Sequence, residues 1–164
     1  MSGASGFHQR LLTIGGNSTE VLLERLAAAS VSLNDYARTL FADERFTTEA
    51  EPRTLHVVAR ALPDLGLAEG GTFEEILAAA AAQGLAPCPL EVAPHLRVAW
   101  TEQPIGPYLT VASLPLDDAA DAPNGLYLRH LDDGLWLRGY RADDDYVYAP
   151  DFTEFVFVDP SANA

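Results

Sequence analysis

From residue 95 onward the chain alternates between apolar and polar residues, and turn sequences interrupt the alternation at short intervals. A period of two is the spacing of side chains that share one face of a β-strand. Strands are therefore predicted at residues 97–101, 108–114, 126–131, 135–141 and 154–158. Short links such as Asp132-Asp133-Gly134 favour hairpins, so neighbouring strands should run antiparallel.

The first half of the chain has the pattern of helices instead. Three segments carry apolar residues at helical spacing. Each segment begins with a potential N-cap residue and an acidic residue three positions later: Asn17 and Glu20, Ser32 and Asp35, and Thr72 and Glu75. The first two helices should form a short helical hairpin, and a β-branched run at residues 54–61 adds one strand. Pro87, Pro89 and Pro94 predict an irregular segment before the sheet, because each proline ring fixes φ and removes a donor.

These patterns predict one α+β domain, in which an N-terminal helical hairpin and a third helix pack with a mainly antiparallel sheet of five to six strands. The chain of 164 residues is 48% apolar, which is enough to bury a core without disulfides or metals. We expect the domain to span residues 11–160, with helices concentrated in 17–84 and strands in 95–158. Residues 1–10 are rich in glycine and serine and should form a flexible arm.

The charge balance excludes several classes of partner. Acidic residues number 24 against ten basic residues, all of them arginine, which gives a net charge of −14. Such a field repels nucleic acids and anionic membranes, so neither is expected as a partner. The chain shows no cationic and apolar leader, and no apolar run approaches the ~20 residues that span a bilayer. Cys88 is the single cysteine, which excludes an intrachain disulfide and fits a cytoplasmic location.

The alternation divides the predicted sheet into two faces. One face is apolar and should be the core: Val98, Trp100, Leu109, Val111, Leu126, Leu128, Leu135 and Leu137. The opposite face collects arginines and aromatic residues together with Thr110. Its candidate binding residues are Arg97, Tyr108, Tyr127, Arg129, Trp136, Arg138 and Tyr140.

Guanidinium groups among tyrosine and tryptophan rings suit recognition. They stack on planar groups and form forked hydrogen bonds with carboxylates or phosphates, and these residue types are enriched in interface hot spots. The alternative is that arginines and aromatics simply cover the wet face of an antiparallel sheet through cross-strand pairs, or that the N-terminal helices lie over them.

Other clusters carry less chemistry. The aspartates of residues 143–145 lack the alternating oxygen ligands and glycine turn of a calcium loop, so they are interpreted as a solvated turn. The histidines His8, His56, His95 and His130 are scattered, without the spacing that places two ligands on one helix face. Cys88 lacks the setting of a catalytic thiol. We therefore expect no metal and no cofactor. The sequence identifies no catalytic residues, and a protein without enzymatic activity is favoured over an enzyme.

The strings at residues 85–97, 123–128 and 133–140 resemble those of a group of short bacterial proteins without an assigned activity. Some members of that group are labelled helicases. This chain has no Gly-Lys-Ser/Thr phosphate loop and is too short for two motor domains, so the label does not carry over. The resemblance implies no functional residues.

The first hypothesis is a non-enzymatic, acidic protein-binding or regulatory module, comparable to an immunity protein, an antitoxin or an adaptor. Its Arg/aromatic sheet face would engage another protein, with a basic partner favoured by charge, or a second copy of the chain. The alternative is a small-molecule-binding protein or enzyme that holds an anionic or planar ligand between sheet and helices. The orientation of Arg97, Arg129 and Arg138 discriminates, because a concave cavity favours the small ligand and an open flat face favours the protein.

Overall fold

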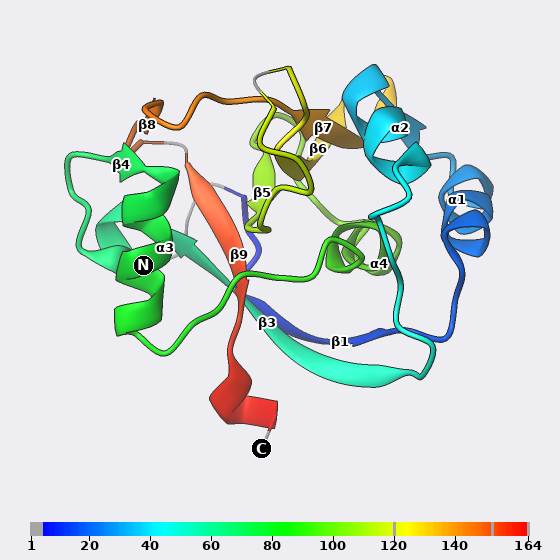
Figure 1. Cartoon of the computed structure of the whole chain (residues 1–164), viewed down its shortest axis with the longest axis horizontal. Helices are drawn as coiled ribbons and strands as arrows, with labels where there is room; N and C mark the ends of the chain where they lie inside the picture. Colours follow the sequence, from blue (N-terminus) through cyan, green and yellow to red (C-terminus); the bar gives the residue numbers. More distant parts are fainter. Residues whose placement is uncertain (1–4, 120, 152, 164) are drawn as a thin grey trace.

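The computed structural model describes residues 5–119, 121–151 and 153–163 and shows an α+β fold built on a curled, mixed sheet (Figure 1). Across these residues the sheet has seven strands in the order β1-β3-β9-β5-β6-β7-β2, where five to six were predicted. Their bounds are β1 Gln9–Ile14, β2 Ser32–Leu33, β3 Arg53–Ala61, β5 Leu109–Val111, β6 Gly125–Leu131, β7 Gly134–Tyr140 and β9 Glu154–Val158. A separate two-stranded sheet joins β4 (Gly71–Thr72) to β8 (Val147–Tyr148).

Most neighbouring strands are antiparallel, as the hairpin sequences predict. The β6–β7 hairpin pairs through all seven residues of each strand across the turn at Asp132 and Asp133. Two pairs are parallel, β5 with β9 and β2 with β7, because long connections bring these strands together. The short strands β2, β4 and β8 and the N-terminal strand β1 are additions to the predicted set.

Four α-helices in the described residues cover the two faces of the sheet unequally: α1 Thr19–Ala28, α2 Asp35–Ala42, α3 Phe73–Ala82 and α4 Val92–Ala99. One face of β5, β6 and β7 packs under α2 and α4 and supplies the larger core, with Leu109, Leu126 and Leu137 fully buried. The opposite face of β3 and β9 packs under α3 around Phe155 and Phe157. None of the described helices has the length and apolar character needed to cross a membrane.

Helices α1, α2 and α3 each begin at a residue whose side chain caps the helix N-terminus, and in α1 and α2 this residue differs from the predicted one. At α3, Thr72 and Glu75 form the predicted capping box. At α1 the cap is Ser18, one residue beyond the predicted Asn17. At α2 the cap is Asn34 instead of Ser32, because Ser32 is used in β2.

The predicted helical hairpin does not form, because β2 separates α1 from α2 and pairs with β7. α2 packs on β7, and α1 packs on α4. The Asn34 side chain fastens α2 to β7, since it accepts from the Gly139 N–H at 2.8 Å and donates to the Gly139 carbonyl at 2.9 Å. Gly139 must be small here, because an added Cβ would lie 2.6 Å from the Tyr36 backbone.

The largest error of the sequence prediction lies between residues 87 and 101. This stretch holds α4 (Val92–Ala99) where an irregular segment and a strand were predicted. Pro94 is the third residue of that helix, where no intrahelical hydrogen bond requires its missing N–H. Arg97 therefore belongs to a helix on the core side of the sheet and leaves the predicted Arg/aromatic face.

Arg97 is fully buried and ties α4 to the sheet. Its guanidinium donates to the Trp100 carbonyl and to Gln103 Oε1, each at 2.6 Å, and more weakly to the Trp136 carbonyl at 3.3 Å. Gln103 in turn donates to the Leu128 carbonyl at 3.0 Å. Burial lowers the pKa of Arg97 to about 10, so the side chain remains a cation at neutral pH.

The described part of the expected N-terminal arm, residues 5–10, is packed against the domain. The Ser5 N–H and hydroxyl donate to the two carboxylate oxygens of Glu154 at 2.7 and 2.9 Å. The Phe7 ring is buried edge-on against Trp100, with ring centroids 5.1 Å apart. Buried contacts therefore hold a segment whose glycine and serine content predicted flexibility.

A second buried carboxylate, Glu91, fixes the start of α4. It accepts from the backbone N–H of Glu49 at 2.7 Å and of Gly15 at 3.2 Å, and it lies 3.3 Å from His95 Nε2. Burial lowers the pKa of His95 below 6.5; Glu91 opposes this shift and the nearby Arg25 adds to it. The ring is therefore neutral at neutral pH.

Replacement of Arg97 by methionine should lower the free energy of unfolding by about 3 kcal/mol, because buried acceptors lose their donor. Urea unfolding measures this change. Arg38→Met, at an exposed arginine on α2, is the matched control and should change stability by less than about 0.5 kcal/mol. Equal effects of the two substitutions would contradict a structural role for Arg97.

Acidification should destabilise the fold through His95. Its folded pKa lies below its unfolded value of 6.5, so the unfolded chain binds the proton first and stability falls as pH drops below about 6.5. Thermal unfolding between about pH 7.5 and 5.5 should show this loss, which His95→Gln should reduce. His8→Gln, at an exposed histidine, should keep the wild-type pH dependence. A His95→Gln profile that parallels wild type would refute the assignment.

Candidate functional site

Six of the seven candidate residues lie on or beside the outer face of β5, β6 and β7, opposite α2 and α4. Tyr127 is paired with Thr110 on one side and with Arg138 on the other, and Arg129 is paired with Trp136. Leu126, Leu128 and Leu137 point into the core from the same strands. Strand alternation therefore places the aromatic and arginine side chains together, with Arg97 as the exception.

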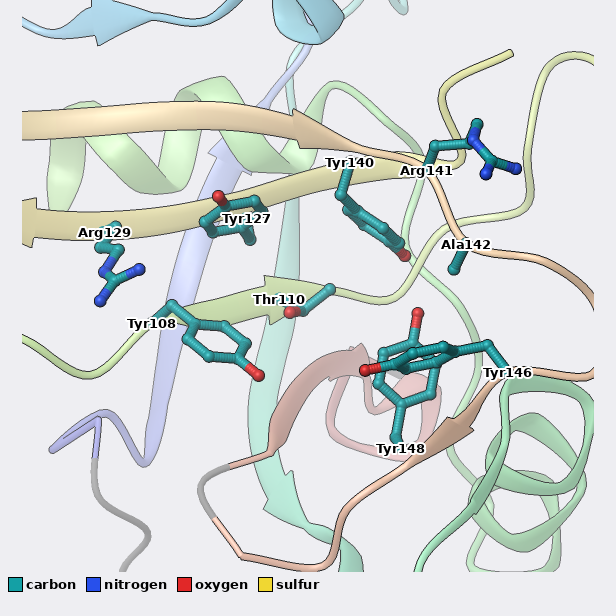
Figure 2. A pocket seen from close by; sticks show the side chains of 9 residues that line it. All are labelled: Tyr108, Thr110, Tyr127, Arg129, Tyr140, Arg141, Ala142, Tyr146 and Tyr148. Atoms are coloured by element: carbon teal, nitrogen blue, oxygen red, sulfur yellow. The ribbon is translucent and has the colours of Figure 1, made fainter. Parts of the chain in front are cut away.

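A pocket with a volume of about 290 Å³ opens on this face (Figure 2). Five of the six tyrosines in the chain line it, and they come from β6, β7, the residue before β5 and the β8 segment. The sixth, Tyr36, lies on α2. We call this site the tyrosine pocket, with the lining residues Tyr108, Thr110, Tyr127, Arg129, Tyr140, Arg141, Ala142, Tyr146 and Tyr148.

The rings support one another around the pocket. Tyr127 contacts Tyr108 and Tyr140, with ring centroids 5.7 and 6.3 Å apart. Tyr146 and Tyr148 meet edge to face at 4.8 Å. In Figure 2 the hydroxyls of Tyr108 and Tyr140 point toward the Tyr146 and Tyr148 pair, so polar groups converge on a space walled by ring faces.

Two glycines allow this arrangement. Gly125 is paired with Tyr140, and an added Cβ would lie 3.3 Å from the Tyr140 ring. Gly70, just before β4, has φ of +91°, and an added Cβ would lie 2.2 Å from the Tyr148 carbonyl oxygen. Gly70 thus lets β8 approach β4 closely enough to place Tyr148 in the wall of the pocket.

The phenols are held in their neutral form. Burial raises the pKa of Tyr140 well above 10, and interaction with Tyr148 raises it further. Burial also raises the pKa of Tyr148 to about 12, although a hydrogen bond with Tyr140 works against this shift. At neutral pH both side chains therefore keep the hydrogens that they can donate.

The described residues that line the tyrosine pocket include two arginines and no carboxylate. Arg129 donates from Nε to the Gly106 carbonyl at 3.1 Å, which anchors its guanidinium at one end of the pocket. Arg141, at the other end, forms an ion pair with Asp143 at 2.8 Å. In a chain with more than twice as many acids as bases, this lining is locally electropositive at the Arg129 end.

Trp136 and Arg138 continue the face beyond the pocket. The Arg138 guanidinium carbon lies 4.2 Å from the centroid of the Trp136 ring. The indole N–H donates to Asp133 at 2.8 Å and fixes the ring. The pair lies beside the pocket on the same sheet face, because Trp136 is paired with Arg129 and Arg138 with Tyr127.

Sequence reasoning missed Arg141, Tyr146 and Tyr148. The alternation of tyrosines at 146 and 148 was the available signal, but the preceding aspartates led to the interpretation of a solvated turn. The described residues contain no group of three His, Cys, Asp or Glu side chains suited to a metal. Burial raises the pKa of the Cys88 thiol, which keeps it protonated. The tyrosine pocket is thus equipped for stacking and hydrogen bonding.

A spectrophotometric titration should resolve the buried phenols. Tyr140 and Tyr148 should ionise well above pH 10, and Tyr140→Phe should raise the pKa of Tyr148 further because the opposing hydrogen bond is lost. Tyr36→Phe, at an exposed tyrosine on α2, is the control and should leave the ionisation of Tyr140 and Tyr148 unchanged. An unchanged or lowered pKa of Tyr148 in Tyr140→Phe would contradict the assignment.

Comparison of the chain with protein-family models, curated proteins and solved structures gives no match.

Proposed function

We propose that the chain is a non-enzymatic binding module that recognises another protein through the tyrosine pocket and the adjoining Trp136–Arg138 pair. The observation that carries this proposal is the gathering of five tyrosines from separate segments on a sheet face that lies opposite α2 and α4. Tyrosine, tryptophan and arginine supply most of the binding energy in protein interfaces, where they present large contact areas at low entropic cost.

The shape of the site favours a protein over a small molecule. Pockets for small ligands typically enclose about 300–1,000 Å³ and cover most of the ligand. The tyrosine pocket, at about 290 Å³, lies just below that range and is open, with Tyr146 on its rim 51% exposed. The space between the sheet and helices α2 and α4, where a ligand was the alternative, is filled by the core.

The charge around the site favours a basic partner. The tyrosine pocket adjoins a smaller acidic hollow that shares Arg141 and Ala142 and is lined by Asp117, Asp118, Asp143 and Asp144. A net charge of −14 attracts cationic proteins over long distances and speeds their association. Stacking in the tyrosine pocket would then supply affinity, and the aspartates would supply steering.

Two exposed tyrosines give a matched test. Tyr146, on the pocket rim, is 51% exposed, and Tyr36, on α2, is 41% exposed. The immobilised wild-type chain and Tyr36→Ala should capture the same protein from host lysate, and Tyr146→Ala should lose it. With the purified pair, calorimetry should show affinity reduced at least about tenfold by Tyr146→Ala, and association should slow as salt rises.

Equal capture by both variants would refute the use of the tyrosine pocket. A small planar anion that stabilises wild type against heat, but not Tyr146→Ala, in the absence of any captured protein would assign the pocket to a small ligand instead.

A further inference from the structure

Strand β1 is the outermost strand at one end of the sheet, and half of its backbone groups point away from the protein. The Ala59 N–H donates to the His8 carbonyl at 2.9 Å, which makes His8 and Ala59 a hydrogen-bonded pair. Hydrogen-bonded pairs alternate in an antiparallel ladder, so Arg10 and Leu12 also bond to β3. The N–H and C=O groups of Gln9, Leu11 and Thr13 must then face outward.

The register of the next strand supports this assignment. His56 lies opposite Leu11, and its carbonyl accepts from Asp159 N–H at 2.8 Å, on the far side of β3. Leu11 and His56 therefore form a non-bonded pair. Among the described residues, the outward groups of Leu11 and Thr13 have no hydrogen-bond partner in the protein.

This edge lacks the usual protection against pairing. Leu11, in the middle of β1, is 67% exposed, more than any other large apolar side chain in the described ranges. Edge strands are normally shortened, bulged or covered, since unpaired backbone groups are a template for another strand. A six-residue strand with an exposed leucine at its centre is such a template.

A groove with a volume of about 260 Å³ runs beside β1, between it and helices α1 and α4, which lie together on one side of β1 in Figure 1. We call it the edge groove. Its described lining contains Arg10 and Arg25 and no carboxylate. Arg10 is anchored by a 2.7 Å hydrogen bond to the Ala99 carbonyl, and Arg25 is exposed at the opposite wall. His95 also lines the groove but is neutral at neutral pH.

We propose that β1 is a docking edge for an extended segment of another protein, which adds as an eighth strand and carries acidic side chains at alternate positions. Side chains of an added strand alternate between faces. Those on the side of Arg10 would enter the edge groove beside two arginines, and those on the other side would cover Leu11. Salt limits the reach of charge to about 8 Å under physiological conditions, so the two arginines that line the groove act on a docked segment more strongly than acids beyond that distance.

This surface is separate from the tyrosine pocket, since β1 lies at the opposite end of the sheet from β6 and β7. The inference does not depend on the proposed function. An antiparallel contact between two copies centred on Leu11 would also cover the edge, but each copy carries a charge of −14, which opposes their approach.

The test uses a synthetic peptide of alternating valine and glutamate, as long as β1, with fluorescence anisotropy and amide NMR shifts as readouts. The peptide should bind wild type and shift the amides of Leu11 and Thr13. Arg25→Glu should weaken binding of the valine–glutamate peptide at least about tenfold, because the charge in the groove is reversed. A valine–lysine peptide should bind the wild-type chain at least about tenfold more weakly than the valine–glutamate peptide does. Arg38→Glu, a charge reversal on α2, is the matched control and should bind as wild type.

Backbone pairing is tested from both sides. Leu11→Pro removes one outward N–H and should weaken binding, as should methylation of alternate amide nitrogens in the peptide. The methylated peptide leaves the protein unaltered, so the test holds even if Leu11→Pro fails to fold. Absence of binding, or equal binding of the methylated or lysine peptide, overturns the proposal. A wild-type dimer that Leu11→Pro converts to monomer assigns the edge to a second copy instead.

Discussion

Arg97, a buried guanidinium cation with no carboxylate partner among the described residues, holds this fold together. It is surrounded by neutral oxygens from the Gln103 side chain and from the backbone carbonyls of Trp100, Arg129 and Trp136, and burial lowers its pKa. A buried cation is tolerated where several hydrogen-bond acceptors surround it. Loss of these acceptors would leave an uncompensated charge in the core. Its contacts fix α4 across β6 and β7, and thereby decide which face of those strands is inner and which is outer.

The outer face is divided between a covered part and an open part. Over β3 and β9 it is covered by α3 around Phe155 and Phe157, and over β5, β6 and β7 it carries the tyrosine pocket. The pocket forms at this boundary because β8, paired with β4 beside α3, brings Tyr146 and Tyr148 up to the tyrosines of the main sheet. The β8 segment, held beside the helix that covers one half of the sheet, thus supplies one wall of the pocket on the other half.

The α+β class and strands β3, β6, β7 and β9 follow from the sequence, because strict alternation and turn residues are local signals. The prediction for Arg97 failed because residues 97–101 alternate by chance within and just after a helix, and because Pro94 lies in its first turn, where proline is tolerated. Tyr146 and Tyr148 could not be placed from local patterns, since β8 exists through pairing with residues more than 70 positions earlier. Long-range pairing therefore hid two of the five tyrosines that line the pocket.

Strand β9 has a consequence for biosynthesis. It lies in the interior of the sheet, every one of its residues is buried, and it bonds to β3 on one side and to β5 on the other. A nascent chain that has not yet reached Val158 must leave one edge of β3 and one edge of β5 unpaired and both cores open. Folding of this protein must therefore wait on the ribosome until nearly all of the domain has been synthesised, an interval in which chaperones would have the most to shield.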